Sequence, residues 1–426
     1  MQNFFKKINL IIKDPSLRNR IFFVIGALII FRFLSIIPIP GIDPVKLQAF
    51  FGGATGDIFG LFNVFSGGGL SRVSIVMLGV GPYITASIVM QLLTMIFPKL
   101  KEMYQEEGEA GRAKFAQYSR ILTVPLALIQ GGGFLLLLQK SGVITQLSSL
   151  EMITNIMVII AGSVLLTWIG ELMTEFGIGN GTSLIIFAGI VASVPTNLSQ
   201  LLVTFSASQI PLYIAFVVVA LLVVLGVVIV TEAERPIPVT YAKRVRGNKV
   251  YGGVSTYLPL RVNQAGVIPI IFALSILLFP QMIFQFLSTG VSNGTIKAIS
   301  DFILAILKNG WFYSIFYFIL VFLFTYFYTA VTFDPHAISE NLQKNGAFIP
   351  GVRPGQSTAE YIGKVLTRIT LVGAIFLGLI AVLPLAMRAV TGITSLAIGG
   401  TALLIVVSVV IDLMKKVDAQ VSMREY

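Results

Sequence analysis

Long apolar stretches separated by short polar segments dominate this chain. A helix needs about 20 apolar residues to cross the hydrocarbon core of a bilayer. Ten windows meet that requirement: Ile21–Ile39, Val73–Phe97, Ile121–Gln139, Met152–Gly170, Ile178–Leu202, Ile210–Val230, Val262–Leu287, Trp311–Phe333, Ile369–Met387 and Ile393–Ile411. Only the first window contains a formal charge, Arg32. The pattern predicts an all-α integral membrane protein with ten transmembrane helices.

Composition agrees with this prediction. Hydrophobic residues make up 56% of the 426 residues, and only 12% are charged, whereas a soluble domain carries about 25% charged residues. Such a chain is expected to be a membrane protein before any motif is considered.

The basic residues predict the orientation. The net charge of +11 comes from Lys and Arg, and these concentrate in alternate loops between the windows. Loops rich in Lys and Arg remain in the cytoplasm. We therefore expect a multi-pass protein with both termini cytoplasmic.

The first 20 residues form a basic, amphipathic segment. At helical spacing Phe4, Phe5, Ile8, Ile11 and Ile12 share one face, and the lysines fall away from it. This pattern is typical of a helix lying on the membrane surface. We expect a cytoplasmic surface segment over residues 1–20, and no cleavable signal peptide.

Two long cytoplasmic loops have internal structure. Residues 232–261 contain extended segments on either side of a basic turn at 246–249, which predicts a projecting hairpin. Residues 334–366 contain Pro350-Gly-Val-Arg-Pro-Gly355. Proline and glycine on both sides of Arg353 predict a stiff, tight tip that carries one guanidinium.

One outer segment is apolar but too short to cross the bilayer. Glycines at 52–53 and 67–69 bracket it. A short apolar helix between glycine hinges, leading into a span, predicts a re-entrant element at about 56–69.

Ten spans divide into two halves of five. An odd number of spans in each half inverts the second half relative to the first. On this count we expect residues 21–205 to form the N-terminal half and 206–413 the C-terminal half. Residues 414–426 would form a cytoplasmic tail.

The sequence lacks most of the residue types and motifs that catalytic and metal sites use. The chain has no cysteine and a single histidine, His336, which removes disulfides, thiolate metal sites and histidine-based metal sites. Neither a Walker A sequence nor His-Glu-x-x-His occurs. Asp and Glu are absent from the windows, although intramembrane carboxylates are the usual mark of ion coupling. We expect no enzyme, metal or cofactor, and a coupled transporter is disfavoured.

Seven motifs in order identify a resemblance to the SecY family along nearly the whole chain. They are Gly67-Gly-Gly-Leu-Ser-Arg72 with Leu78-Gly-Val-Gly-Pro-Tyr-Ile-Thr-Ala-Ser-Ile88, Gly177-Ile-Gly-Asn-Gly-Thr-Ser-Leu-Ile-Ile-Phe-Ala-Gly-Ile190, Glu234-Arg-Pro-Ile-Pro-Val239, Arg261-Val-Asn-Gln-Ala-Gly-Val-Ile-Pro269, Pro350-Gly-Val-Arg-Pro-Gly355 and Gly399-Gly-Thr-Ala-Leu-Leu-Ile405. The sequences of these motifs resemble those of bacterial members of the family.

The resemblance implies a function and a set of partners. The family forms an hourglass pore between two pseudo-symmetric inverted halves of five helices. It passes unfolded preproteins across the bacterial inner membrane and releases transmembrane segments into lipid through a lateral gate. The implied partners are SecE, SecG, the SecA ATPase, translating ribosomes, signal sequences and membrane lipid. It implies no cofactor.

The resemblance also assigns roles to residues near the pore. The implied pore ring is Val80, Ile84, Ile186, Ile190, Ile271 and Ile405. From residue type alone these aliphatic side chains would face lipid or neighbouring helices. The implied plug, which would close the pore from outside, is Ile58, Phe59, Leu61, Phe62, Val64, Phe65 and Ser66. Without the resemblance this segment reads equally well as an ordinary apolar loop.

Further roles are implied at the gate and in the cytoplasmic loops. Thr85, Gln130 and Asn263 match the polar cluster of the lateral gate, although such residues also serve in ordinary helix packing. Arg244, Arg246 and Arg353 match positions where partners dock. The positive-inside bias would also explain these charges.

Two other functions remain open from the sequence. A secondary transporter also has inverted repeats, but it should place ion-liganding residues at the membrane midplane. A structural scaffold for other membrane subunits is the third possibility.

Overall fold

A computed structural model describes most of the chain. The described residues are 14–42, 46–47, 50, 66, 68–70, 72–105, 107–144, 148–203, 210–242, 244–246, 249–251, 255–290, 294–391 and 399–422. Most of the predicted surface segment 1–20 and the last residues of the predicted tail therefore lie outside them. So does the boundary predicted between the halves at 205/206, which stays a prediction.

Helices occupy every predicted window. In the first half they are α2 (Pro15–Leu34), α5 (Gly81–Ile96), α6 (Pro98–Gln105), α7 (Gly108–Lys140), α8 (Ser149–Phe176) and α9 (Gly181–Val203). In the second half they are α10 (Ile210–Glu232), α11 (Ile268–Gly290), α12 (Gly294–Lys308), α13 (Gly310–Thr332), α14 (Pro335–Lys344), α15 (Gln356–Thr391) and α16 (Gly399–Ser422). Helices α6, α12 and α14 were not predicted.

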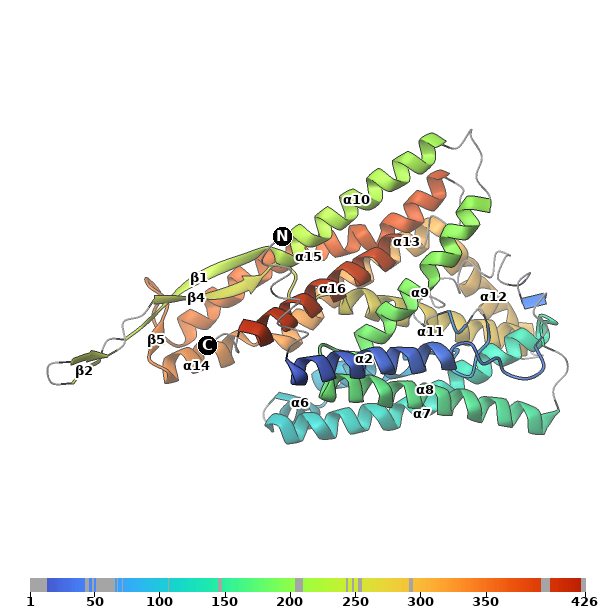
Figure 1. Cartoon of the computed structure of the whole chain (residues 1–426), viewed down its shortest axis with the longest axis horizontal. Coiled ribbons are helices and arrows are strands. Elements are labelled where there is room, and N and C mark those ends of the chain that lie inside the picture. The colour runs from blue at the N-terminus through green and yellow to red at the C-terminus, as the bar shows by residue number, and fades with distance from the viewer. Residues whose placement is uncertain are drawn as a thin grey trace.

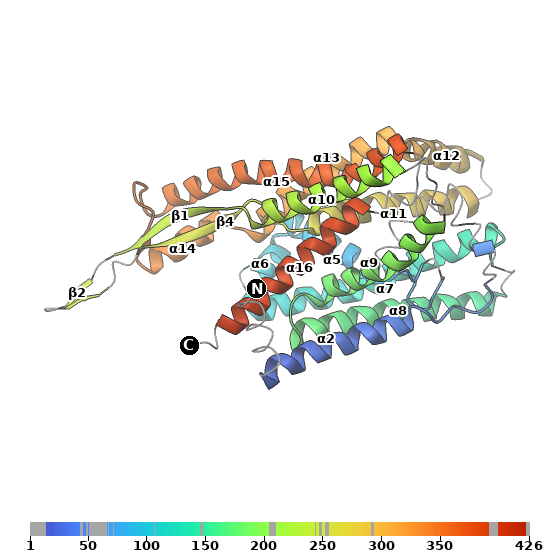
Figure 2. The same cartoon turned by 45° about the horizontal axis from the view of Figure 1, so that its top comes forward.

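The long helices run side by side in one bundle. In both views α2, α7 and α8 form one side and α10, α13 and α15 the other, with α9, α11 and α16 between them (Figures 1 and 2). Figure 2 places α5 among these inner helices. The largest cluster of buried apolar side chains takes members from these inner helices and from α2, α8, α10, α13 and α15 around them. The middle of the bundle is therefore built from helices of both halves.

Among the described residues, five helices are long and apolar enough to cross a membrane by length and composition alone: α7, α8, α10, the segment from α13 through α14, and α15. The bent pair α5–α6 would make a sixth. Prolines inside α9 and α11 interrupt two further windows, and proline bends a helix because it removes a backbone hydrogen bond.

The prediction for the second window was partly wrong. Val73–Phe97 was expected to be one helix, but residues 72–80 form turns and the helix begins at Gly81. Val73 and Gly79 have positive φ angles of 45° and 57°, which an α-helix cannot contain. Non-helical backbone occurs at membrane depth only where protein covers it, and here Val73, Val76 and Met77 are fully buried.

Neighbouring backbone satisfies the polar groups of this turn segment. The N–H of Ile39 donates to the carbonyl of Val73 at 3.0 Å, and the N–H of Ile75 donates to Ile37 at 3.0 Å. The hydroxyl of Ser163 on α8 donates to the carbonyl of Gly79 at 3.0 Å. Gly162 approaches so closely that a Cβ atom there would lie 2.1 Å from the carbonyl oxygen of Ile75.

The start of the first span also differs from the prediction. The surface segment was expected to end at residue 20, but α2 already begins at Pro15. Asp14 is its N-cap and accepts a hydrogen bond from the N–H of Ser16 at 2.9 Å. An acidic cap followed by proline is a favourable helix start, so residues 15–20 belong to the same helix as the span.

An arm projects from one end of the bundle (Figure 1). The predicted hairpin is confirmed: β1 (Glu234–Tyr241) pairs antiparallel with β4 (Ser255–Arg261), and β2 (Arg244–Arg246) pairs with β3 (Lys249–Tyr251). A third strand, β5 (Ala347–Phe348), joins the other edge of β1. It comes from the second loop, so the two loops share one sheet.

Side-chain packing fixes the arm against the bundle. Ile237 and Val239 of β1 point to one face and are buried with Ile362 and Leu366 of α15. Helix α15 starts long before its apolar window, and this extension carries the sheet. The sheet of the arm therefore packs on the first turns of α15, the same helix that continues into the apolar window.

Candidate functional site

Six aliphatic side chains predicted to form a ring lie in one buried cluster. Val80 and Ile84 come from the start of α5, Ile186 and Ile190 from α9, Ile271 from α11, and Ile405 from α16. All six belong to the central cluster, and none is more than 8% exposed. Residue type alone would have placed them against lipid, whereas the structure buries them inside the bundle; their role as a pore ring stays a prediction.

The cluster can act as a seal. Branched aliphatic side chains offer no hydrogen bond to water or ions, and a narrow apolar constriction excludes water. Since these side chains belong to one buried cluster, a chain passing among them would have to displace them. Because none of the six side chains carries a polar group, none of them selects a particular residue of a passing chain.

The predicted plug lies almost entirely outside the described residues. Of its members only Ser66 is described, and it is fully buried. Its hydroxyl accepts a hydrogen bond from the N–H of Leu70 at 3.0 Å. Ser66 therefore anchors the end of this segment to the buried turns at 68–70.

The three predicted gate residues are all buried, on or next to helices that pack together. Thr85 lies on α5, Gln130 on α7, and Asn263 shortly before α11, and each of these helices contacts the other two. No hydrogen bond joins the three side chains in the described part of the chain. Thr85 donates to the carbonyl of Gly81 in its own helix, whereas the amide oxygens of Gln130 and Asn263 have no partner.

These unpartnered oxygens weaken the packing where they occur. A buried polar group without a hydrogen bond costs about 1–3 kcal/mol. Gln130 is 4% exposed and Asn263 is 7% exposed. An interface that contains such groups separates more easily than one that is apolar throughout.

The predicted tip at 350–355 is a rigid frame around an exposed arginine. Gly351 and Gly355 have φ angles of 84° and 98°, which favour glycine. The hydroxyl of Thr358 donates to the carbonyl of Arg353 at 2.9 Å, and that of Ser339 donates to Gly355 at 2.6 Å. The backbone is thus held while the guanidinium stays accessible. The other two docking candidates, Arg244 and Arg246, lie in β2 of the arm.

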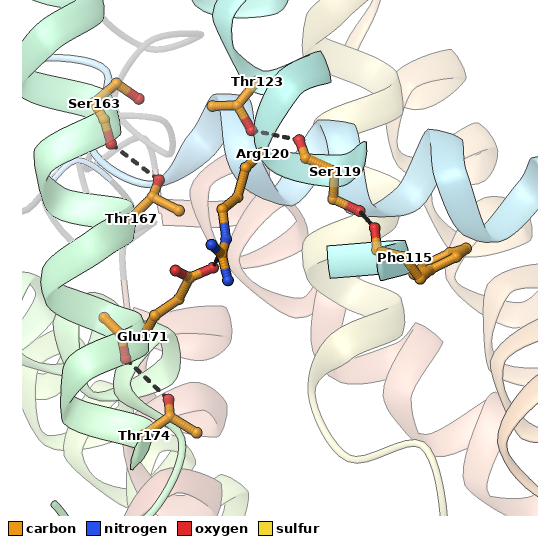
Figure 3. A network of polar contacts seen from close by, with 9 residues as sticks. Phe115, Ser119, Arg120, Thr123, Ser163, Thr167, Glu171 and Thr174 are labelled. Atoms are coloured by element: carbon orange, nitrogen blue, oxygen red, sulfur yellow. Dashed lines mark hydrogen bonds and ion pairs between the residues drawn. The ribbon is translucent and has the colours of Figure 1, made fainter. Parts of the chain in front are cut away.

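An ion pair between α7 and α8 was not predicted. The Nε of Arg120 donates to a carboxylate oxygen of Glu171 at 2.7 Å (Figure 3). Around this pair, serine and threonine hydroxyls of both helices donate hydrogen bonds to backbone carbonyls one turn earlier in the same helix. Both charges directly adjoin apolar windows, which begin at Ile121 and end at Gly170. The sequence shows both charged residues next to apolar windows, but only the fold shows that they form an ion pair with each other.

Comparison with known sequences gives one consistent family. A profile of the SecY family matches residues 74–414. The "Protein translocase subunit SecY" of Corynebacterium glutamicum is 42% identical and covers 97% of each chain. The proteins of the same name from Vibrio cholerae and Thermotoga maritima are also 42% identical, over 96% and 97% of this chain and 93% and 95% of their own.

Solved structures share the fold at lower identity. A structure described as a protein conducting channel aligns with a TM-score of 0.67 at 20% identity, covering 97% of this chain and 94% of its own. A Sec61 structure from a canine ribosome-channel complex of the endoplasmic reticulum aligns with a TM-score of 0.63 at 19% identity, over 97% and 94%. This likeness supports the membrane bundle described above.

Proposed function

The chain belongs to the SecY family, and from this premise we propose that it forms the central channel of a bacterial protein translocase. Unfolded preproteins pass through the apolar ring, and transmembrane segments leave sideways between α5, α7 and α11. One observation carries this proposal: six aliphatic side chains from helices of both halves meet in a single buried cluster.

The ring suits a substrate of variable sequence. Aliphatic side chains contact any passing residue without selecting a particular one, and they close again behind it. A transporter would instead place ion-liganding groups at midplane. In the described residues no group of three or more acidic or histidine side chains could hold a metal ion, and the relatives do not support the transporter alternative.

Disulfide crosslinking of an arrested substrate tests the channel. The chain has no cysteine, so an engineered one reacts without background. Ile186→Cys and Ile271→Cys should each form a disulfide with a cysteine in a preprotein arrested during translocation. Val217→Cys on α10, which is 55% exposed on the apolar surface, is the matched control. Equal crosslinking to the control would contradict passage through the ring.

We propose the bacterial inner membrane as the location, with the arm and both termini in the cytoplasm. The basic loops support this orientation. SecE and SecG are the proposed membrane partners. The outer face of α10 supports a membrane partner or lipid there, since only 11% of its apolar window is buried, against 44% in α7 and α15.

SecA and translating ribosomes are the proposed cytoplasmic partners, and Arg353 is the proposed contact. A guanidinium binds carboxylates or phosphates bidentately, and this one is exposed on a braced tip. Arg353→Glu should stop SecA-driven translocation without changing the amount of folded protein, because the side chain makes no ion pair among the described residues. Translocation into reconstituted vesicles measures this. Lys344→Glu on neighbouring α14 is the control, and unchanged secretion by Arg353→Glu would leave Arg353 as a topology signal only.

A further inference from the structure

Helix α12 (Gly294–Lys308) is a short element at the end of the bundle opposite the arm (Figures 1 and 2). Its 15 residues are too few to cross a bilayer. It contacts α11, which precedes it, and α13, which follows it. A single residue, Asn309, joins it to α13, and the side chain of Asn309 caps α13 by accepting a hydrogen bond from the N–H of Trp311 at 3.1 Å. The helix is therefore held beside both neighbours.

The side chains of α12 divide into three faces at 3.6 residues per turn. Ser300 and Leu304 are 1% and 8% exposed and lie against the bundle. Lys297 and Asp301, one turn apart, form an exposed polar face. Three large apolar side chains lie on the remaining side and are exposed by 38%, 53% and 67%: Ile296, Ile299 and Phe302. Large apolar side chains gathered on one exposed side of a helix mark a contact with lipid or with another protein.

The adjoining start of α13 favours lipid as this contact. Trp311, three residues after the end of α12, is 81% exposed, and Ile315 on the next turn of α13 is 59% exposed. Tryptophan is enriched where the hydrocarbon core meets the headgroups, so Trp311 marks the depth at which α13 enters the membrane. Since α12 ends directly before α13, we expect its exposed apolar side chains to reach the same hydrocarbon boundary.

A hydrogen bond and an apolar contact connect α12 to the bundle. The hydroxyl of Ser288, in the last turn of α11, donates to a carboxylate oxygen of Asp301. Leu307 packs against the central cluster of buried apolar side chains. Helix α11 is one of the three between which transmembrane segments are proposed to leave. A helix that fixes the outer end of α11 would therefore act on that exit.

We propose that α12 lies in the interface of the outer leaflet, with Ile296, Ile299 and Phe302 among the lipid acyl chains and Lys297 at the headgroups. The partner is the lipid surface itself. The choice of the outer leaflet rests on the proposed orientation, with the arm in the cytoplasm. An amphipathic helix is stable at the interface because its apolar side leaves water while its charged side stays in it. Through Asp301 the helix holds the outer end of α11 at a fixed depth.

Spin labels on single cysteines measure the depth of α12. The chain has no cysteine, so Phe302→Cys and Lys297→Cys each give one labelled site in the complex with cysteine-free membrane partners, reconstituted in lipid vesicles. The label at 302 should relax faster with oxygen, which dissolves in lipid, and the label at 297 with a water-soluble nickel chelate. Lys297 is exposed on the polar face of the same helix, which makes it the matched control.

Two results would overturn the proposed lipid contact. Access of the nickel chelate to 302 equal to its access to 297 would place the apolar side of α12 in water. Protection of 302 from both reagents would assign that side to a protein partner. The measurement does not depend on translocation, so the lipid contact can fail while the proposed channel function holds.

A distance measurement tests the connection to α11. Spin labels at Leu287→Cys in the last turn of α11 and Leu150→Cys at the start of α8 report the separation of these two helix ends by pulsed electron resonance. Phe302→Asp should add a second distance, because hydrocarbon expels a carboxylate and α12 moves with it. Lys297→Asp changes the charge on the polar face and should keep the parent's distribution. The same distribution in Phe302→Asp and Lys297→Asp would show that α12 does not position α11.

Discussion

Ile405 has 1% of its surface exposed in the central cluster, whereas Val410, further along the same helix, is 37% exposed. The two residues are similar in size and polarity but lie on different faces of α16. Ile405 is packed among other side chains and Val410 lies on the surface of the bundle, so we expect the two residues to have different roles. Substitutions at single positions can therefore separate a channel residue from a helix-surface residue.

Ile405→Asn should make the resting channel conduct small ions. An ion in a dry apolar constriction loses hydration without replacement, and an amide offers water both a donor and an acceptor. Single-channel recording on the purified complex without substrate measures the leak. Val410→Asn should remain silent. Silence in both variants, or equal leakage, would remove Ile405 from the ring.

Gln130→Leu should make the gate harder to open. The change removes a buried, unpartnered amide oxygen and keeps similar volume, so the closed packing gains up to about 1–3 kcal/mol. Preproteins with weak signal sequences should then be exported several-fold less, while strong signals are nearly unaffected. Export into reconstituted vesicles measures both. Gln139→Leu, at the outer end of the same helix, should behave as the parent, and increased export of weak signals would contradict this explanation.

The turn segment at 72–80 shows how one element depends on another. Its backbone cannot form a helix, yet it is buried at membrane depth, and α8 covers it. Gly162 allows this contact, because any side chain there would collide with the carbonyl of Ile75. The hydroxyl of Ser163 then bonds to Gly79. Consecutive residues of α8 therefore supply the space and the hydrogen bond that a broken span requires.

Gly162→Ala should destabilise the protein, although alanine favours helix formation. A Cβ atom 2.1 Å from a carbonyl oxygen forces the two elements apart, and overpacking of this kind costs about 1–3 kcal/mol. Thermal unfolding of the detergent-solubilised complex measures the loss. Gly133→Ala on α7 has nothing within 4 Å and should be neutral or stabilising by up to ~1 kcal/mol. Equal melting temperatures for Gly162→Ala and the wild type would show that α8 can shift to accommodate the methyl group without loss of stability.

Over the whole molecule, polar and apolar surfaces divide along the bundle axis. The arm with its sheet and α14 occupies one end, and the start of α8 lies at the other (Figure 1). Exposed apolar side chains cover the helices between them, as on α2 and α10. This distribution suits a chain whose middle is in lipid and whose ends are in water.

Cysteine labelling from each side should confirm the orientation. Tyr257→Cys in β4 and Leu150→Cys at the start of α8 replace residues that are 67% and 76% exposed. In sealed inside-out vesicles a membrane-impermeant maleimide should label Tyr257→Cys only, and Leu150→Cys should react after the vesicles are opened. Because the wild type has no cysteine, it is the blank. Reversed labelling would invert the proposed topology.

The sequence by itself determined the helical windows, apart from residues 72–80, and the hairpin of the arm. Lipid provides no hydrogen bonds to the backbone, so a long apolar window must become a helix wherever lipid surrounds it. Turn residues act equally locally: Gly179 has a φ angle of 94° in the connection between α8 and α9. The Asp14-Pro15 cap was also a local signal, and the predicted boundary at residue 20 overlooked it.

Only the tertiary structure decided the remaining features. Residues 72–80 are as apolar as a helix, but α8 shields their backbone from lipid and so permits turns. Strand β5 pairs with β1 although the two are far apart in sequence. The six residues predicted to form the ring enter one buried cluster only when α5, α9, α11 and α16 pack together. The cavity beside α9, α11 and α16 likewise brings together Arg261 and Ser408, which are far apart in sequence. Apolar periodicity records that a side chain avoids water, but not whether lipid or protein replaces it, and that choice depends on packing between distant segments.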